Sequence, residues 1–275
     1  MIVSTTNIAK TASISTTPAS SLQDIYVVTD GDYSSVFSEA MTGQIQIKFQ
    51  FPQPVDIGYV AIGGSNISTK DSISIIAADS SAFANWKTVD GRQLVSTDPF
   101  NLTVGLENEI DDADLGESDS NSMMYKADLF QVSQLIITVK GGGDISIAEI
   151  AMGDYYTIPR GEQAGYSRAW STPNIKARSS TNLDGAPINI SYEARSLSMS
   201  LSVPNNLMVN FDGWYKFINF AATNTFYILE DENKFHSYAC FNAMPEMTKA
   251  HSSTRSLGSS SIKFNAYAKS TEAIF

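Results

Sequence analysis

Cysteine is nearly absent from this chain of 275 residues, because Cys240 is its single thiol. One cysteine excludes an intrachain disulfide, a four-cysteine zinc site and a dithiol redox pair, so we expect Cys240 to be a buried core residue. Charged residues are also scarce, at 17% of the chain, against about 25% in ordinary soluble domains. The sequence contains neither a long apolar run nor a charged start followed by one, and therefore predicts neither a membrane span nor a secretion signal.

The usual catalytic motifs are missing as well. No GxSxG, HExxH, phosphate-binding loop or dinucleotide-binding fingerprint occurs in the sequence. The glycine-rich stretch Lys140–Asp144 lies between two predicted strands, and this context indicates a hairpin turn. We therefore expect no enzymatic activity. A glycosidase needs only two carboxylates, however, and the 29 acidic residues leave such a pair open.

Positive charge is deficient in one half of the chain only. Residues 1–155 carry 7 Lys and Arg against 20 Asp and Glu, a net charge of −13, whereas residues 156–275 carry 11 against 9, a net charge of +2. Seven of the acids lie between Glu107 and Asp119, a composition typical of a solvated segment or an acidic contact surface. A half this acidic repels phosphate, so we expect no nucleic-acid partner. The Pro and Gly residues near 156–165 predict a linker between two domains, 1–155 and 156–275.

What the first half does contain is alternating hydrophobicity. Ile45, Ile47, Phe49 and Phe51 alternate with polar residues, which predicts a strand with one buried face. A second alternating pair at 135–139 and 145–147 predicts a hairpin closing this domain near Gly153. Short strands with Gly and Asn turns, without a long helical period, indicate a β-sandwich. Continued alternation places Glu149 on the buried face, where a carboxylate needs a partner.

The second half combines strands with one helix. Residues 188–192 and 197–203 alternate in hydrophobicity, and further strand patterns follow near 225, 237 and 261. Between them, Trp214, Phe217, Ile218 and Ala221 recur at helical spacing behind a capping Asp212. The predicted fold class is thus mainly β: an N-terminal jelly-roll β-sandwich followed by a second β-barrel or sandwich with one short helix.

The first half resembles the discoidin-like, or galactose-binding-like, jelly rolls. The early loop "VVTDGDYSSVF", the strand region "IQIKFQFPQPVDIGYVAI" and the closing "LIITVKGGGDISIAEIAMG" follow the order of that family over roughly Ser20 to Gly153. The resemblance implies a structural calcium held by Asp30, Asp32 and Glu149, with loop carbonyls completing an oxygen shell. The alternative is that Glu149 accepts hydrogen bonds from backbone N–H groups of the loop. No other cofactor is expected.

Sugar binding is a second property that the resemblance brings to this half. Tyr33, Asn66 and Trp86 could form a small stacking platform for a glycan. Few other groups suited to holding sugar hydroxyls are present, because this half has no His and only one Arg. The alternative is that its large aromatic side chains pack in the core.

The second half resembles minor tail or tail-tip proteins of long-tailed bacteriophages, in the run from "GYSRAWSTPNIKARSS" through "DGWYKFINFAATNTFYI". This resemblance implies a structural virion protein, made in the host cytoplasm and placed in the tail, whose partners are other tail proteins. The nearly balanced charge of residues 156–275 permits self-association, and we expect these residues to form a ring of copies. The expected assembly interface is the aromatic set Trp214, Tyr215, Phe217, Phe220, Phe226 and Tyr227. The alternative function is a carbohydrate-binding module that recognises a cell-surface glycan.

Overall fold

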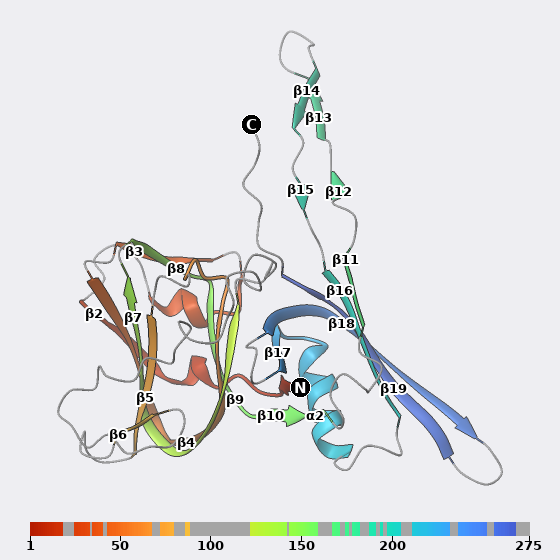
Figure 1. Cartoon of the computed structure of the whole chain (residues 1–275), viewed down its shortest axis with the longest axis horizontal. Helices are drawn as coiled ribbons and strands as arrows, with labels where there is room; N and C mark the ends of the chain where they lie inside the picture. The colour runs from red at the N-terminus through yellow and green to blue at the C-terminus, as the bar shows by residue number, and fades with distance from the viewer. Residues whose placement is uncertain are drawn as a thin grey trace.

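The computed structural model describes residues 1–18, 25–33, 35–40, 43–67, 72–79, 86–88, 122–141, 143–158, 167–170, 174–175, 178–181, 187–190, 193–194, 197–204, 211–231, 236–251 and 256–267. The described chain is mainly β with a single α-helix, arranged as two β bodies side by side (Figure 1). This confirms the predicted fold class. No helix among the described residues is long and apolar enough to cross a membrane.

The first body is a β-sandwich. One sheet has the order β2 (Ser13–Thr17), β4 (Gly43–Gly63), β7 (Met123–Gly141), β5 (Ser72–Asp79) and β6 (Trp86–Thr88), and β9 (Glu149–Gly153) also pairs with β4. The short pair β3 (Phe37–Ala40) and β8 (Asp144–Ile147) and the 3-10 helices η1 (Ala9–Thr11) and η2 (Ile25–Thr29) pack on its core. The predicted alternation in β4 is confirmed, because Ile45, Ile47, Phe49 and Phe51 are all buried.

The predicted hairpin at 135–147 is wrong in its pairing. Both strands exist, but β7 lies between β4 and β5 and has no free edge, so β8 pairs with β3 instead. The following strand, β9, pairs with the second part of β4. The turn at Lys140–Asp144 thus directs the chain to the other layer of the sandwich rather than to a neighbouring strand.

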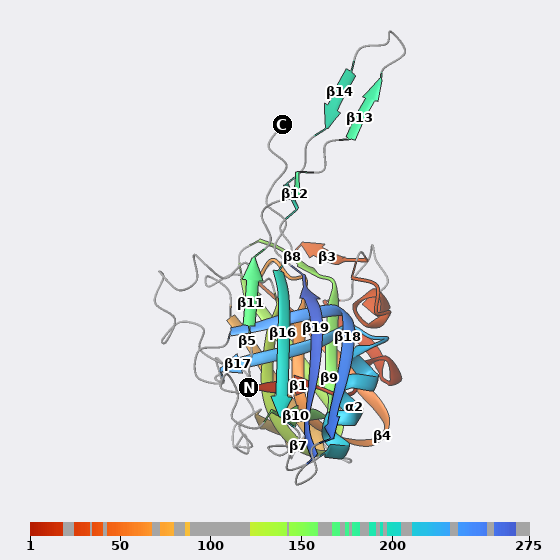
Figure 2. The ribbon, with the colours of Figure 1, turned by 90° about the vertical axis from the view of Figure 1, so that its right-hand side faces the viewer.

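The second body is a seven-stranded sheet with one helix. Its order is β10 (Tyr155–Thr157), β1 (Ile2–Ser4), β17 (Phe226–Asp231), β18 (His236–His251), β19 (Ser256–Ala266), β16 (Leu197–Pro204) and β11 (Ser167–Trp170). The helix α2 (Phe211–Ala221) buries Trp214, Phe217, Ile218 and Ala221 in the core of this body, as its spacing predicted. Two further pairs, β12 (Asn174–Ile175) with β15 (Glu193–Ala194) and β13 (Arg178–Thr181) with β14 (Pro187–Ile190), extend beyond β11 and β16 (Figure 2).

The first strand of the chain belongs to the second body. β1 pairs with β10 on one side and with β17 on the other, so Val3 lies opposite Tyr156 and Ile228. The predicted boundary at 155/156 therefore assigns residues 2–4 to the first domain, although they pair in the sheet of the second body. The independent folding of 1–155 stays a prediction, and any such fragment carries β1 without its two partner strands.

A buried apolar contact joins the two bodies. Ile2, Tyr227, Leu229 and Ala239 of the second body cluster with four residues of the first, which are Tyr59, Ala61, Met124 and Ala151. Hydrogen bonds add to this contact, since the buried hydroxyl of Ser237 accepts from Met124 N at 3.0 Å and donates to the carbonyl of Ser122 at 2.9 Å. The junction therefore holds the bodies in one orientation and defines the clefts on either side of it.

We predict that Val3→Ala destabilises the whole chain rather than fraying its end. Val3 is fully buried in the second core, and removing two buried methyl groups should lower the free energy of unfolding by about 2 kcal/mol. Urea denaturation followed by tryptophan fluorescence measures this change. Ser15→Ala, on an exposed position of β2, is the matched control. Equal stability of the two variants would contradict the central role of β1.

Candidate functional site

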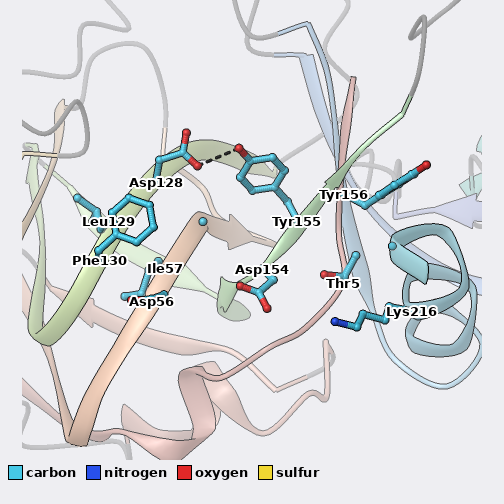
Figure 3. A pocket seen from close by; sticks show the side chains of 12 residues that line it. Thr5, Asp56, Ile57, Asp128, Leu129, Phe130, Asp154, Tyr155, Tyr156 and Lys216 are labelled. Atoms are coloured by element: carbon cyan, nitrogen blue, oxygen red, sulfur yellow. Dashed lines mark hydrogen bonds between the residues drawn. The ribbon is translucent and has the colours of Figure 1, made fainter. Parts of the chain in front are cut away.

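A cleft of about 330 Å³ opens where the first body meets β10 and helix α2 (Figure 3). Its walls come from four places far apart in sequence: residues 56–58 of β4, residues 128–130 of β7, residues 154–156 before and within β10, and Gly213 with Lys216 of α2. Thr5 completes the lining. Both bodies contribute to the cleft, so its shape depends on the junction described above.

An irregular stretch of β7 forms one wall. Between Lys126 and Val132 this strand carries one extra residue at each of two steps relative to β4, and Asp128 and Gln131 adopt φ values of 46° and 54°. Residues other than glycine seldom take positive φ, and such strain persists where the surroundings hold it and often marks ligand sites. The Asp56 carboxylate holds this stretch by accepting a hydrogen bond from Gln131 N at 2.9 Å.

The Phe130 ring points outward from this stretch of β7. Phe130 is 74% exposed, the highest value among the exposed large hydrophobic side chains of the described chain, while its neighbour Leu129 is buried. These two adjacent residues face opposite sides of the sheet, as neighbours in a strand do. Here one fills the core and the other presents an aromatic ring at the mouth of the cleft.

Tyr155 forms the facing wall. Its hydroxyl donates to Asp128 Oδ1 at 2.8 Å, and Lys126 lies 5.6 Å from its ring centre and 3.6 Å from Asp128 Oδ2. Burial and then the hydrogen bond to Asp128 raise the pKa of Tyr155, so the ring stays neutral. The ring lies against Gly58, where an added Cβ would approach Tyr155 Cδ1 to 2.8 Å. Glycine at position 58 therefore allows this close packing.

The charge of the cleft is mainly negative. Asp56, Asp128 and Asp154 supply three carboxylates, and Lys216 approaches Asp154 from the helix side (Figure 3). Carboxylates accept strong hydrogen bonds from hydroxyl groups, and aromatic rings stack on apolar faces. The cleft thus combines the two kinds of group that hold a polyhydroxylated molecule.

The structure places Glu149 inside the junction rather than in this cleft. Glu149 is 3% exposed, and its carboxylate accepts hydrogen bonds from the Tyr227 hydroxyl at 2.9 Å and from Asn7 Nδ2 at 3.3 Å. The inward orientation expected from the alternation is confirmed, but the partners are side chains, one of them from the second body, rather than backbone groups of the Asp30 loop. Burial, partly offset by the Tyr227 hydrogen bond and reinforced by Asp30, raises the pKa of Glu149 to about 7.

The predicted calcium ligands do not fit that ion well. Asp30 and Glu149 line a common cavity of about 470 Å³ on the other side of the junction. Both oxygens of Glu149 already accept hydrogen bonds, however, and Asp30 Oδ1 accepts from Asp32 N at 2.7 Å. Within the described ranges, no group of three or more His, Cys, Asp or Glu side chains could hold a metal ion.

Two of the three predicted platform residues, Tyr33 and Asn66, are engaged in contacts within the chain. The Tyr33 ring stacks on Tyr267 with centroids 3.9 Å apart, and its hydroxyl bonds to Ser122 at 2.9 Å. Asn66 is tied to β8, since it accepts from Ser146 N and donates to the Asp144 carbonyl, both at 2.8 Å. Tyr33 and Asn66 thus connect segments that lie far apart in the sequence. Trp86 lies in β6, and its side chain is outside the described residues.

The predicted assembly aromatics are mostly core residues, which corrects the expectation. Trp214, Phe217, Phe226 and Tyr227 are fully buried within the chain. The first three are in ring contact, with 5.5 Å between the Trp214 and Phe217 centroids and 5.4 Å between those of Phe217 and Phe226, whereas Tyr227 belongs to the junction cluster. The core around helix α2 therefore holds more aromatic side chains than the length of this helix suggested. Tyr215, at 51% exposed, remains available at the surface, and Phe220 is half-buried.

Two further expectations concern Cys240, which the structure describes, and the acidic run, which it does not. Cys240 is buried and hydrogen-bonded to the Tyr238 carbonyl at 3.8 Å, which confirms a core thiol, and burial raises its pKa well above the ordinary value. The acidic run from Glu107 to Asp119 lies outside the described residues.

Sequence reasoning missed the cleft residues Asp56, Asp128, Phe130, Asp154 and Lys216. One signal was present: in "YKADLFQVSQL" the alternation slips at Leu129–Phe130, where two apolar residues are adjacent. Such a slip is typical of a bulge. The other walls of the cleft lie far away in sequence and carry no local signal.

Comparison with known proteins gives no family model and no curated protein that matches the chain. Solved structures similar to about half of it include carbohydrate-binding modules. A module produced by Clostridium perfringens (CpGH89CBM32-6) has 12% identity and a TM-score of 0.38, with 54% of this chain and 99% of that chain covered. A Streptococcus pneumoniae fucose binding module has 18% identity, a TM-score of 0.35 and coverage of 55% and 99%. At these scores the matches assign no ligand to this chain.

We predict that Glu149 makes stability depend on pH. Its pKa is about 7 in the folded chain against an ordinary value of 4.5, so the folded state binds the proton more tightly than the unfolded state. The resulting stabilisation, about 3 kcal/mol, is complete below pH 4.5 and is lost as the pH rises through 7. Glu149→Gln should flatten the melting temperature between pH 5 and about 8, relative to the parent chain. Asp144→Asn, an exposed carboxylate, is the control; the same pH slope in all three proteins would contradict the assignment.

Proposed function

We propose that this chain is a carbohydrate-binding protein and that the junction cleft holds the ligand. The observation that carries the proposal is the outward ring of Phe130, held on a strained stretch of β7 directly beside three carboxylates and Tyr155. A ligand that covers this ring would gain the free energy of burying its apolar face. The strain at Asp128 and Gln131 costs free energy, and ligand binding is a physical reason for it.

The chemistry of the cleft matches a sugar ring. The apolar C–H face of a pyranose can stack on Phe130, while its hydroxyl groups donate to Asp56, Asp128 or Asp154. A volume of about 330 Å³ is at the lower end of ordinary ligand pockets and suits one or two sugar units. Asp128 is already engaged by Tyr155 and Lys126, an arrangement that positions it as a fixed acceptor and favours binding over hydrolysis.

The charges select among carbohydrates. The lining carries three carboxylates and Lys216, and Lys126 pairs with Asp128 from outside the lining, so the net charge stays negative and an anionic sugar such as a uronate would be repelled. Neutral hexoses and their oligomers carry only hydroxyl groups, which the carboxylates accept. We therefore propose neutral glycans as the ligand class.

We predict that Phe130→Ala weakens binding of a neutral glycan at least about tenfold, the equivalent of one lost stacking contact. A glycan array identifies the ligand, and isothermal titration calorimetry on the full chain then measures the dissociation constant. Met244→Ala is the matched control, because Met244 is 69% exposed but lies on β18, away from this cleft. It should leave affinity unchanged.

Three results would count against this function. One is that no neutral glycan on the array binds the chain, and another is that Phe130→Ala leaves the affinity unchanged. The third is the release of new reducing ends from the bound oligosaccharide, which would replace binding with hydrolysis by the cleft carboxylates.

A second candidate function is a structural subunit of a phage tail, located in the virion. The observation that favours it is the paired β-strand extension beyond β11 and β16, which projects from the second body (Figure 1). Projecting hairpins are suited to contacts between subunits, because their strand edges are open to another chain. Immunogold labelling of purified virions that encode the chain tests this candidate; labelled tails support it and unlabelled particles contradict it. Both functions are compatible in one tail protein that binds a surface glycan.

A further inference from the structure

The cavity of about 470 Å³ on the other side of the junction, which we call the Glu149 cavity, is a second enclosed space between the two bodies. Helix α2 borders both spaces, the cleft with residues near its start and the cavity with Phe220 and Ala221 at its end. The first body contributes residues 29–31 to the cavity, and β18 of the second body contributes residues 241–242. The volume is within the ordinary range of ligand pockets.

Glu149 is a buried carboxylate in the wall of this cavity. Its hydrogen-bond partners are uncharged, namely the Tyr227 hydroxyl at 2.9 Å and the Asn7 side-chain amide at 3.3 Å. Each carboxylate oxygen can accept a second hydrogen bond, so Glu149 can receive further donors. Within the described part of the chain, the charged side chain that acts on Glu149 is Asp30, which is also an acid. A bound cation would therefore supply a balancing charge that the described residues do not provide.

The other charges around the cavity also favour a cation. Asp30 lines the cavity together with Glu149. The end of helix α2 adds partial negative charge, because the carbonyl groups of its last turn point toward that end. Lys10 lines the cavity too, but its side chain is exposed, and water weakens the interactions of an exposed charge. An anion in the cavity would meet two carboxylates, one of them buried, and would be repelled.

A stack of three aromatic rings ends at the cavity. Tyr267 lies between Tyr33, with ring centroids 3.9 Å apart, and Phe241, with ring centroids 4.2 Å apart. Two rings at these distances cover both faces of Tyr267. At one end of the stack, Tyr33 packs against Gly64, where an added Cβ would approach Tyr33 Cε1 to 3.0 Å. Phe241 forms the other end, and it lines the cavity and is only half-buried.

The rest of the lining is rich in hydroxyl and amide groups. Thr29, Thr223, Thr225 and Asn242 contribute such groups to the wall. Asn224 donates its amide hydrogens to the Phe220 carbonyl at 3.0 Å and to the Thr223 hydroxyl at 2.9 Å, so its amide oxygen remains as an acceptor. Side chains of this kind hold the hydroxyl groups of a ligand.

We propose that the Glu149 cavity binds a small amino sugar through its protonated amine. The ammonium group pairs with Glu149 and Asp30, the hydroxyl groups bond to the threonine and asparagine side chains, and an apolar C–H face packs on Phe241. Because Glu149 is 3% exposed, the amine must be carried on a short arm that reaches inward. This site is separate from the neutral-glycan cleft and does not depend on it.

Three sugars that differ only at carbon 6 test the charge preference. 6-Amino-6-deoxyglucose carries an ammonium group there, glucose a hydroxyl group and glucuronate a carboxylate. Isothermal titration calorimetry on the full chain at about pH 8, where the amine is protonated and Glu149 is ionised, measures the three affinities. The amino sugar should bind at least about tenfold more tightly than glucose, and glucuronate should bind most weakly.

Variants locate the bound amine. Glu149→Gln should reduce the affinity for 6-amino-6-deoxyglucose at least about tenfold. Asp30→Asn should reduce it by a smaller factor and keeps an oxygen that can accept from Asp32 N, so it decides the matter if Glu149→Gln fails to fold. Asp144→Asn, which removes an exposed carboxylate outside the cavity, is the matched control and should leave the affinity unchanged. Lys10→Gln should leave it unchanged or raise it.

Two results would overturn the proposal. One is an affinity for 6-amino-6-deoxyglucose no higher than that for glucose, including no binding of either sugar. The other is amino-sugar binding that Phe130→Ala abolishes while Glu149→Gln and Asp30→Asn preserve it, which would place the amine in the cleft. Phe130→Ala should retain amino-sugar binding, so the failure of this site and the failure of the neutral-glycan cleft are distinguishable.

Discussion

Two neighbouring segments of the chain cross between the bodies, and they determine how the two bodies are arranged. The chain passes from β1 toward η1 near its start and from β9 to β10 in the middle, and the two crossings are bonded to each other. Thr5 N donates to the Asp154 carbonyl at 2.8 Å, Ile8 N donates to the Met152 carbonyl at 2.7 Å, and Asp154 N donates to Thr6 Oγ1 at 2.8 Å. A single linker would leave a hinge, whereas two bonded crossings resist rotation. The cleft inherits its geometry from this constraint, because Thr5, Asp154 and Tyr155 are parts of the crossings themselves.

Glu149 shows how a local pattern can be informative and incomplete at once. Alternation in the sequence placed its carboxylate on a buried face, and burial creates the need for donors. The donors came from Asn7 and Tyr227, which are 142 and 78 residues away. Nothing near Glu149 in the sequence specifies them. Proton binding by the Glu149 carboxylate is therefore coupled to the junction, and the local sequence pattern gives no sign of this coupling.

The elements that the sequence predicted well are those that carry their own periodicity. The buried face of Ile45 to Phe51 and the apolar face of helix α2 follow from spacing alone. Strand pairing was harder, because adjacency in sequence favoured a β7–β8 hairpin, while the interior position of β7 excluded it. The irregular path of β7 beside Phe130 depends on two added residues in this strand and on the Asp56 hydrogen bond. These are tertiary details, and the side chains of the cleft are brought together only by the junction.

The position of β1 has a consequence for how the molecule forms. Its partner on one side, β17, pairs Ile2 with Leu229, so this contact closes a loop of more than two hundred residues. Contacts of such long range form late, because the entropy of loop closure must be overcome first. During synthesis the strands of the first body, which end at Gly153, are complete long before β17 exists. Residues 2–4 can therefore pair with β10 once residue 157 has been made, whereas their other edge stays without its partner strand until β17 exists.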